Sequence, residues 1–286
     1  MFRNNKKKQL IGNRAVITGA SSGIGEQYAR QLAAIGSDLV LVARRKDRLE
    51  KLAKELRKNH QIQVDVIDLD LSSPHASLLL FEKATANNTH ITILVNNAGI
   101  GRYGPFMDFP LEDHLSTVQI NSIVPTELTY QFVSHMLSHR KKSYISQIAS
   151  ISAFQPVGCY SVYSATKGYI RYFTESLAFE LKNTNISISC ICPGGTYTEF
   201  LEQAGQKLTS SGHRTMMTSE AVVRTSIQAM LDGKTLHVPG FLNKLACFFP
   251  RFLPRNLSLY LGSKVLNKSA ERVPLPKKVQ MIQIKP

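Results

Sequence analysis

RAVITGASSGIG, residues 14–25, links a short apolar run to a helix through a turn of glycine and serine. Apolar periodicity predicts the helix over residues 23–35 and a following glycine ends it. A strand, turn and helix in this order can present backbone N–H groups and the helix N-terminus to a pyrophosphate. Gly19 permits the tight turn, Gly23 lets the backbone approach the phosphates, and Gly25 lets the helix pack on the strand. A glycine motif alone also fits an ordinary loop, but this setting favours a phosphate site.

Apolar runs and amphipathic helices alternate through most of the 286 residues. The alternation predicts an α/β fold with a single doubly wound (Rossmann) domain, a seven-stranded parallel sheet and helices on both faces. We expect this domain over residues 12–240, between a basic N-terminal tail (1–11) and a basic, aromatic-rich C-terminal extension (241–286). The expected strands are 14–18, 38–43, 62–67, 91–95, 143–148, 186–191 and 235–238, and the expected helices are 23–35, 46–59, 74–86, 111–139, 161–182 and 219–231.

The net charge of +15 is concentrated at the two ends of the chain. Residues 1–14 hold five basic groups and no acid, and residues 241–286 hold nine basic groups and one acid. Because the body between them is nearly neutral, we expect no nucleic-acid partner. In the extension, aromatic residues are mixed with cations, which fits an interfacial membrane segment that delivers lipophilic substrate. The alternative is a flap that packs on a lid or on a partner subunit; its prolines argue against one long amphipathic helix.

The other compositional features indicate an intracellular protein without a metal. The cysteines (Cys159, Cys190, Cys192 and Cys247) show no disulfide or zinc pattern, so a reducing compartment is expected. No secretory signal and no apolar run of roughly 18 residues is found. We therefore expect a cytoplasmic location, with peripheral contact at a membrane surface. His135 and His139 have the i,i+4 spacing of metal ligands, but without a third ligand they indicate a helix surface.

The second predicted strand ends at Ala43-Arg44-Arg45, roughly 20 residues past the glycines. In a dinucleotide site this position reads the adenosine ribose, where an acid would bind the 2′-hydroxyl of NAD. Two arginines suit a 2′-phosphate instead, so we predict NADP (NADPH) as the cofactor. The alternative is a solvated helix N-terminus, but cations there oppose the helix dipole.

A candidate catalytic cluster lies in the second half of the chain. Ser150 ends the fifth predicted strand, and Tyr163 and Lys167 have the i,i+4 spacing that places them on one helix face. A nearby ammonium and an oxidised nicotinamide would both lower the pKa of the tyrosine, while the serine holds the substrate oxygen. The alternative is a plain helix surface. Within the long helix, Pro125 should break the hydrogen bond to the carbonyl of Asn121 and free that carbonyl for a proton-relaying water, or simply kink the helix.

Taken in order, these motifs resemble the short-chain dehydrogenase/reductase family, NADP-preferring, over about residues 12–240. The resemblance rests on residues 18–25, Asn96-Asn97-Ala98-Gly99, Asn121, Ser150, Tyr163-Ser164-Ala165-Thr166-Lys167 and Pro193-Gly194. It implies a catalytic tetrad of Asn121, Ser150, Tyr163 and Lys167, with Tyr163 as the general acid–base. Val124 and Ala153 stand where many members have glycine. The implied cofactor-binding residues are Gly19, Ser21, Ser22, Gly23, Ile24, Gly25, Arg44, Arg45, Asp68 and Leu69 (at the adenine), Asn97, Ala98, Gly99, Tyr163, Lys167, Pro193, Gly194, Thr196 and Thr198.

The substrate pocket should be apolar. We expect its walls from residues 100–106 and 195–217, the latter a mobile lid in this family, and in particular from Ile100, Phe154, Tyr160 and Phe200. The predicted function is therefore an NADPH-dependent oxidoreductase that reduces a carbonyl, or oxidises the alcohol, of a small hydrophobic substrate. The alternative is an NADP(H)-binding regulatory or scaffold protein with little turnover. The resemblance also implies a homodimer or homotetramer that pairs the predicted helix 111–139 and the helix bearing Tyr163.

Overall fold

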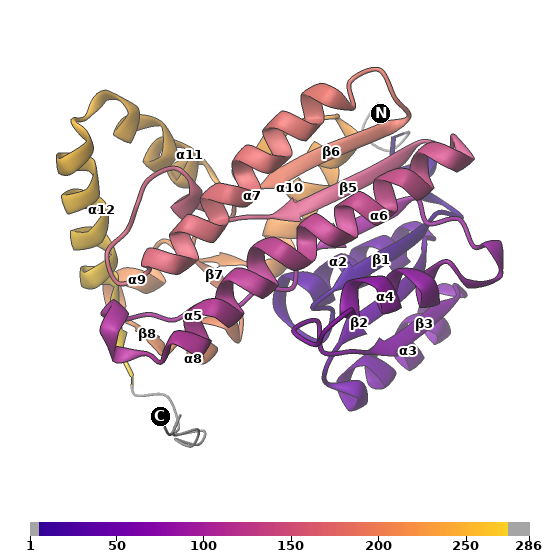
Figure 1. Ribbon diagram of the computed structural model, residues 1–286, viewed down its shortest axis with the longest axis horizontal. Coiled ribbons are helices and arrows are strands. Elements are labelled where there is room, and N and C mark those ends of the chain that lie inside the picture. The colour runs from indigo at the N-terminus through magenta and orange to yellow at the C-terminus, as the bar shows by residue number, and fades with distance from the viewer. Residues whose placement is uncertain (1–5, 274–286) are drawn as a thin grey trace, which may run out of the picture.

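A twisted sheet of seven parallel strands forms the centre of the molecule (Figure 1). The structure is a computed structural model and describes residues 6–273. The strand order is β10-β6-β5-β4-β1-β2-β3, so the direction of winding reverses between β1 and β4. This confirms the predicted doubly wound fold. The strands are β1 (Arg14–Thr18), β2 (Asp38–Ala43), β3 (Val64–Asp68), β4 (Ile93–Asn96), β5 (Ser143–Ile148), β6 (Ile186–Ile191) and β10 (Leu236–His237).

Helices cover both faces of the sheet, each over its own hydrophobic core. On one face pack α2 (Gly23–Ile35), α3 (Lys46–His60) and α10 (Ser219–Leu231). The other face carries α4 (Ala76–Ala84), α6 (Val124–His139) and α7 (Ser161–Glu180). Helices cover both faces of the sheet, so the run Leu39-Val40-Leu41-Val42 of β2 is entirely buried.

The predicted helix over residues 111–139 is divided in the structure. It begins as α5 (Leu111–Val118), passes through one π-helical turn, η4 (Gln119–Ile123), and continues as α6. Pro125 lies in the first turn of α6 and has no N–H to donate to residue 121, so the regular hydrogen-bond ladder is interrupted here. In this turn the N–H of Val124 donates to the carbonyl of Gln119, five residues earlier, as in a π-helix.

Small elements cap the carboxyl ends of the strands. The lid contains β7 (Thr196–Tyr197), α8 (Phe200–Gln203), β8 (Gln206–Leu208), α9 (Ser210–His213) and β9 (Met217–Thr218). The extension follows as α11 (Phe241–Phe248), the 3-10 turn η6 (Phe249–Phe252), α12 (Arg255–Ser269) and β11 (Ala270–Arg272). Prolines at 250 and 254 break it into separate helices, as expected.

The extension packs against the lid. β11 pairs antiparallel with β8, and the N–H of Val273 donates to the carbonyl of Gly205. This contact agrees with the flap interpretation of the extension.

Within residues 6–273, no helix has both the length and the apolar character that crossing a bilayer requires.

Candidate active site

A cavity of about 930 Å³ opens at the carboxyl ends of the strands, where the winding reverses. In open α/β sheets this is the position at which ligands bind, because the connections on either side diverge there. The lid closes one side of the cavity and the extension closes another. The predicted residues that line it are Gly19, Ser21, Ser22, Gly23, Ile24, Arg44, Arg45, Leu69, Asn97, Ala98, Gly99, Ile100, Ser150, Tyr160, Tyr163, Lys167, Pro193, Gly194, Thr196, Thr198 and Phe200.

The glycine turn after β1 is shaped for a close ligand. Gly19 has φ +67°, and a Cβ atom there would lie 2.8 Å from Nδ2 of Asn97. That amide donates to the carbonyl of Thr18 at 2.9 Å and so fixes the turn against the end of β4. A Cβ atom on Gly25 would collide with the carbonyl of Gly19, so this glycine serves the packing of α2 on the turn.

The N-terminus of α2 is the part of the turn that fits a phosphate. Its N-cap residue, Ser22, makes no side-chain hydrogen bond to the first turn of the helix. The first N–H groups of a helix have no partner within it, and the helix dipole favours negative charge there. Gly23 and Ile24 of this first turn line the cavity. The residues present therefore fit the pyrophosphate of a dinucleotide.

The two predicted phosphate-binding arginines have different surroundings. Arg45 donates to the hydroxyls of Ser21 (3.0 Å) and Ser22 (2.9 Å), next to the glycine turn. It also forms an ion pair of 2.5 Å with Glu199 of the lid, which Arg48 contacts as well. Arg44 is exposed, with its guanidinium 3.8 Å from the carboxylate of Asp70. No local pattern in the sequence predicted a role for Glu199, because its arginine partners lie about 150 residues away along the chain.

One of the two residues predicted at the adenine is not part of the cavity wall. Asp68 is exposed and its carboxylate lies 3.8 Å from the ammonium of Lys46. The chain turns into the cavity only after β3 ends, so the wall is formed by Leu69, Asp70 and Leu71. Asp68 thus lies one residue before the wall, and its contact with the adenine stays a prediction.

The predicted catalytic groups meet beside the glycine turn. Ser150, Tyr163 and Lys167 all line the cavity, and Nζ of Lys167 lies 5.6 Å from the centre of the tyrosine ring. The ammonium donates to the carbonyl of Ile148 at 2.8 Å. Burial raises the pKa of Tyr163 to about 12, and the Ser150 hydroxyl opposes this increase. Burial lowers the pKa of Lys167 to about 8. In the protein without a cofactor, burial thus raises the pKa of Tyr163, where the sequence had led us to expect a lowering by the nearby ammonium together with an oxidised nicotinamide.

Asn121 lies behind the cavity wall, in the π-helical turn. Its side-chain oxygen accepts from the N–H of Ile100 at 2.9 Å, and its amide donates to the Ile100 carbonyl at 2.8 Å and to the Thr166 hydroxyl at 3.1 Å. The side chain therefore joins the segment after β4 to α7, which bears Tyr163 and Lys167.

Aromatic side chains surround Tyr163. The ring of Tyr160 lies 5.0 Å and that of Phe200 5.4 Å from the Tyr163 ring, measured between centroids. Phe154, in contrast, does not line the cavity, so its prediction was wrong. Its ring lies 4.1 Å from the guanidinium of Arg171 on α7 and packs in a separate apolar cluster beneath the extension.

The extension supplies a wall that the sequence did not predict. Residues of α11, η6 and α12 line the cavity together with those of the lid. The sequence signal was the apolar character of residues 245–266, but nothing local shows where that segment folds back. The lining residues are Leu245, Ala246, Cys247, Phe249, Pro250, Leu253, Ser258, Leu261, Gly262, Val265, Leu266 and Ser269.

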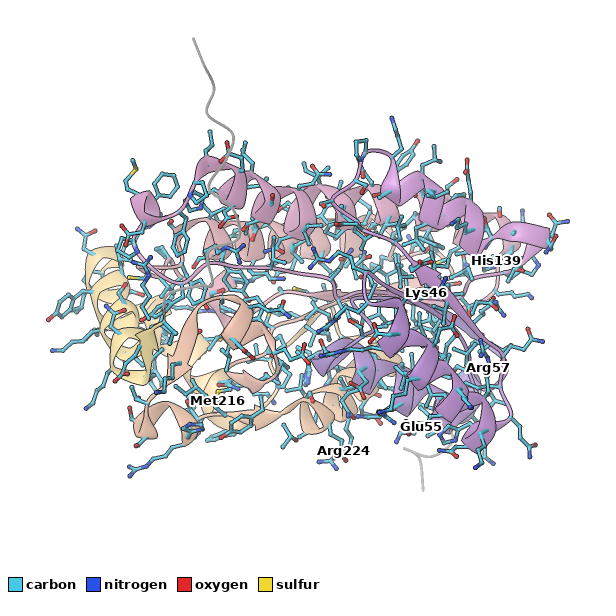
Figure 2. All side chains as sticks on the ribbon, turned by 90° about the horizontal axis from the view of Figure 1, so that it is seen from below. Lys46, Glu55, Arg57, His139, Met216 and Arg224 are labelled. Atoms are coloured by element: carbon cyan, nitrogen blue, oxygen red, sulfur yellow. The ribbon has the colours of Figure 1, made fainter. Side chains whose placement is uncertain are left out.

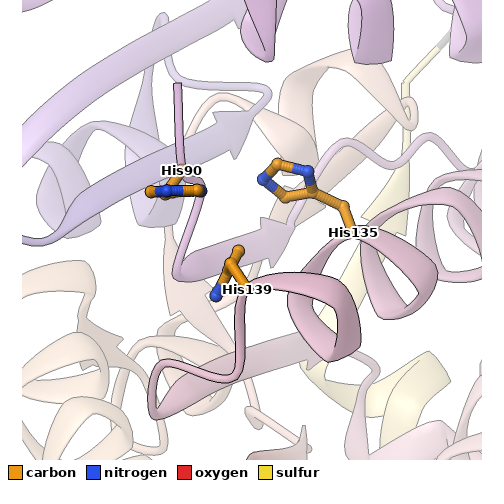
Figure 3. Close-up of side chains that lie close together, drawn as sticks. All are labelled: His90, His135 and His139. Carbon is orange, nitrogen blue, oxygen red and sulfur yellow. The ribbon is translucent and has the colours of Figure 1, made fainter. Parts of the chain in front are cut away.

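A cluster of three histidines lies far from this cavity, near the C-terminus of α6. The expectation of no third residue beside His135 and His139 was wrong, because His90 joins them with ring nitrogens within 4.8 Å (Figure 3). Figure 2 shows His139 at the opposite end of the molecule from Met216 of the lid. His135 accepts the N–H of Ile91, and His139 accepts the N–H of Lys141 and faces the Ile91 carbonyl, each at 3.1 Å. Because both ring nitrogens of His139 are engaged, a metal bound there would have to displace one of these hydrogen bonds, so we assign the two helical histidines a structural role.

The chain also matches a known protein family in sequence. Residues 13–209 match the family model described as short chain dehydrogenase. The chain belongs to the short chain dehydrogenase family. This confirms the resemblance seen in the sequence and places the chain in an oxidoreductase family with a nucleotide-binding fold.

Several members of the short chain dehydrogenase family are similar over most of their length. The very-long-chain 3-oxoacyl-CoA reductase of Bos taurus is 26% identical over 89% of this chain and 81% of its own. A short-chain dehydrogenase from Sphingobium yanoikuyae, solved in complex with NADPH, is 30% identical over 79% of this chain and 87% of its own, with a TM-score of 0.73. A bulky-bulky ketone specific alcohol dehydrogenase from Comamonas testosteroni is 29% identical over 82% and 90% of the two chains, with a TM-score of 0.71.

Proposed function

We propose that this protein is an NADPH-dependent reductase that converts a hydrophobic carbonyl compound to the alcohol, or catalyses the reverse reaction. The observation that carries the proposal is that Ser150, Tyr163 and Lys167 meet in one cavity with the glycine turn. A regulatory protein that only sensed the cofactor would not need this set of side chains.

Each group has a role that its position supports. When bound, the nicotinamide ring supplies or accepts the hydride and, in its oxidised form, carries the positive charge that favours a phenolate. Ser150 would donate a hydrogen bond to the substrate oxygen, and Tyr163 would transfer the proton to it. Lys167 would hold the cofactor's ribose, and its pKa of about 8 keeps a large share protonated near neutral pH. Asn121 would hold the segment after β4 in place against α7 through its hydrogen bonds to Ile100 and Thr166.

The preference for NADP rests on charge at the end of β2. Arg45 is already fixed beside the glycine turn by the hydroxyls of Ser21 and Ser22, and Arg44 is exposed next to it. A 2′-phosphate between them would gain charge-assisted hydrogen bonds that NAD cannot form. The carboxamide and phosphates of the cofactor would be held by residues that follow β6, namely Pro193, Gly194, Thr196 and Thr198. The NADPH complex of the Sphingobium relative supports this assignment.

The shape and lining of the cavity favour a large apolar substrate. Ile100, Tyr160, Phe200 and the largely apolar wall of the extension line the cavity near the proposed catalytic groups, together with polar side chains such as Gln155 and Gln206. The relatives named for very-long-chain 3-oxoacyl-CoA and for bulky ketones point the same way. We propose a fatty acyl, steroid-like or aromatic ketone.

The experiment is a fluorescence titration with NADPH and NADH, followed by NADPH oxidation with a panel of lipophilic ketones and aldehydes. Tight NADPH binding with turnover that is lost in Tyr163→Phe would support the proposal. NADPH binding without turnover on every compound would favour a regulatory protein, and a preference for NADH would contradict the role of the arginines.

We also propose that the protein is a homodimer or homotetramer. Exposed apolar side chains follow the outer surfaces of α6 and α7, where Tyr130, Tyr172 and Phe179 are 79%, 66% and 80% exposed. Such a surface is typical of a subunit interface. Light scattering of the wild type and of Phe179→Asp tests this, since the variant should dissociate.

A further inference from the structure

The helices α11 and α12 lie at one end of the molecule (Figure 1). Together with the 3-10 turn η6 between them, they expose a surface of large apolar side chains. Phe241 is 73% and Phe252 70% exposed, and Phe248 lies 5.2 Å from Phe252 between ring centroids. We call this surface the extension face. Its exposed apolar residues are Phe241, Leu242, Phe248, Phe249, Phe252, Leu253, Leu257, Leu259, Tyr260, Leu261 and Val265. A soluble monomer rarely exposes so many neighbouring large apolar side chains without a partner for them.

The charges of the extension face all have one sign. Residues 241–269 contain five cations and no acid. All five cations are exposed, so they lie at the surface among the aromatic rings. The cations are Lys244, Arg251, Arg255, Lys264 and Lys268. Aromatic residues mixed with cations are typical of a surface that inserts into the interfacial region of an anionic bilayer.

The extension face is also the outer side of the cavity wall. Phe249, Leu253, Leu261 and Val265 are exposed to solvent and line the cavity as well. The same segment therefore borders both the surroundings and the cavity, so a lipophilic molecule that left a bilayer here would meet mainly apolar side chains of the extension, with Ser258 and Ser269 among them.

A second copy of the chain fits the extension face less well. If two copies paired through this face, ten cations would meet without an acid from residues 241–269, and like charges in an interface are unfavourable. Anionic phospholipid headgroups would neutralise the same cations.

We propose that the extension face binds the surface of an anionic lipid bilayer, with the cavity opening toward it. The binding itself does not depend on the proposed function, whereas the delivery of a lipophilic substrate through this opening does. Localisation at a membrane surface would then follow from residues 241–269 alone, without a spanning helix.

The test is co-sedimentation of the full chain with vesicles of phosphatidylcholine, with and without phosphatidylglycerol. We expect binding to the mixed vesicles that weakens with added salt. Phe241→Ser with Phe252→Ser should weaken it by about tenfold or more, because two exposed aromatic anchors are lost. A second variant, with Lys244, Arg251 and Arg255 all changed to Gln, should weaken binding to the mixed vesicles and remove their advantage over neutral ones.

Matched controls separate this surface from general stickiness. Leu78→Ser with Leu79→Ser removes two exposed apolar residues of α4, and Lys54→Gln with Lys58→Gln removes two exposed cations of α3. These variants should bind as the wild type does. Equal binding by all variants, no binding to mixed vesicles, or a fall in oligomer size in Phe241→Ser with Phe252→Ser would each overturn the proposal. NADPH affinity, measured in parallel, shows that the variants are folded, and turnover failing with binding intact would count against the proposed function alone.

Discussion

Replacement of Glu199 by glutamine tests how the cofactor is selected. Glu199 pairs with Arg45 at 2.5 Å and contacts Arg48, and these arginines hold the pKa of its carboxyl below the usual range. If Arg45 receives the 2′-phosphate of NADPH, the carboxylate competes with that phosphate for the same guanidinium. The substitution keeps the size of the side chain and removes its charge.

The expected effect is small because the pair is partly exposed. The side chains of Arg45 and Glu199 are 34% and 39% exposed, and ion pairs of this kind contribute about 0.2–1 kcal/mol. At the upper part of that range, about 0.5–1 kcal/mol, Glu199→Gln should bind NADPH about two- to fivefold more tightly. NADH has no 2′-phosphate, so its affinity should stay unchanged.

The assay is a fluorescence titration of the wild type and the variant with both cofactors at low salt. Glu202→Gln is the control, since Glu202 is an exposed acid of α8 for which no ion pair is found within residues 6–273. If Glu199 instead holds the lid closed over either cofactor, both affinities should fall together. That result would refute the competition argument.

Three further predictions concern other parts of the molecule. Tyr163→Phe should lower kcat by about 10²–10⁴-fold while the NADPH dissociation constant, measured by titration, changes little. Gly25→Ala should cost about 1–3 kcal/mol in denaturant unfolding, because the new Cβ meets the Gly19 carbonyl, whereas Gly168→Ala in open space on α7 should not destabilise. Burial lowers the pKa of His237 from 6.5 to about 4, with smaller effects of Lys244 and Lys234, so the unfolded state takes up the proton first. The free energy of unfolding should therefore fall as the pH drops from about 6.5 to about 4, by about 1–2 kcal/mol after solvent screening, and His237→Gln should reduce this slope.

The sequence predicted well what depends on local spacing. The apolar runs indicated all seven strands of the central sheet, because most of the strand positions are buried between the two layers of helices. The i,i+4 spacing brought Tyr163 and Lys167 to one helix face, and the glycine turn preceded α2 as expected. Pro125 signalled a disturbed helix, although the π-helical form of the disturbance was not foreseen.

The failures concern contacts between distant parts of the chain. Phe154 was expected in the pocket for its apolar ring, yet Arg171 and the extension provide that ring with a different partner. His90 joined His135 from a loop 45 residues earlier, and Glu199 met Arg45 from the lid. Such pairings are decided by tertiary packing, for which the sequence carries no periodic signal.

One wall of the cavity is a single stretch of chain, residues 245–269, and it follows every residue of the predicted tetrad. One wall of the proposed substrate pocket is thus separate, along the chain, from the proposed catalytic residues. Exchange of this stretch between members of the family would reshape the cavity without changing the glycine turn or α7. Substrate range could diverge by such exchanges while the chemistry stayed fixed.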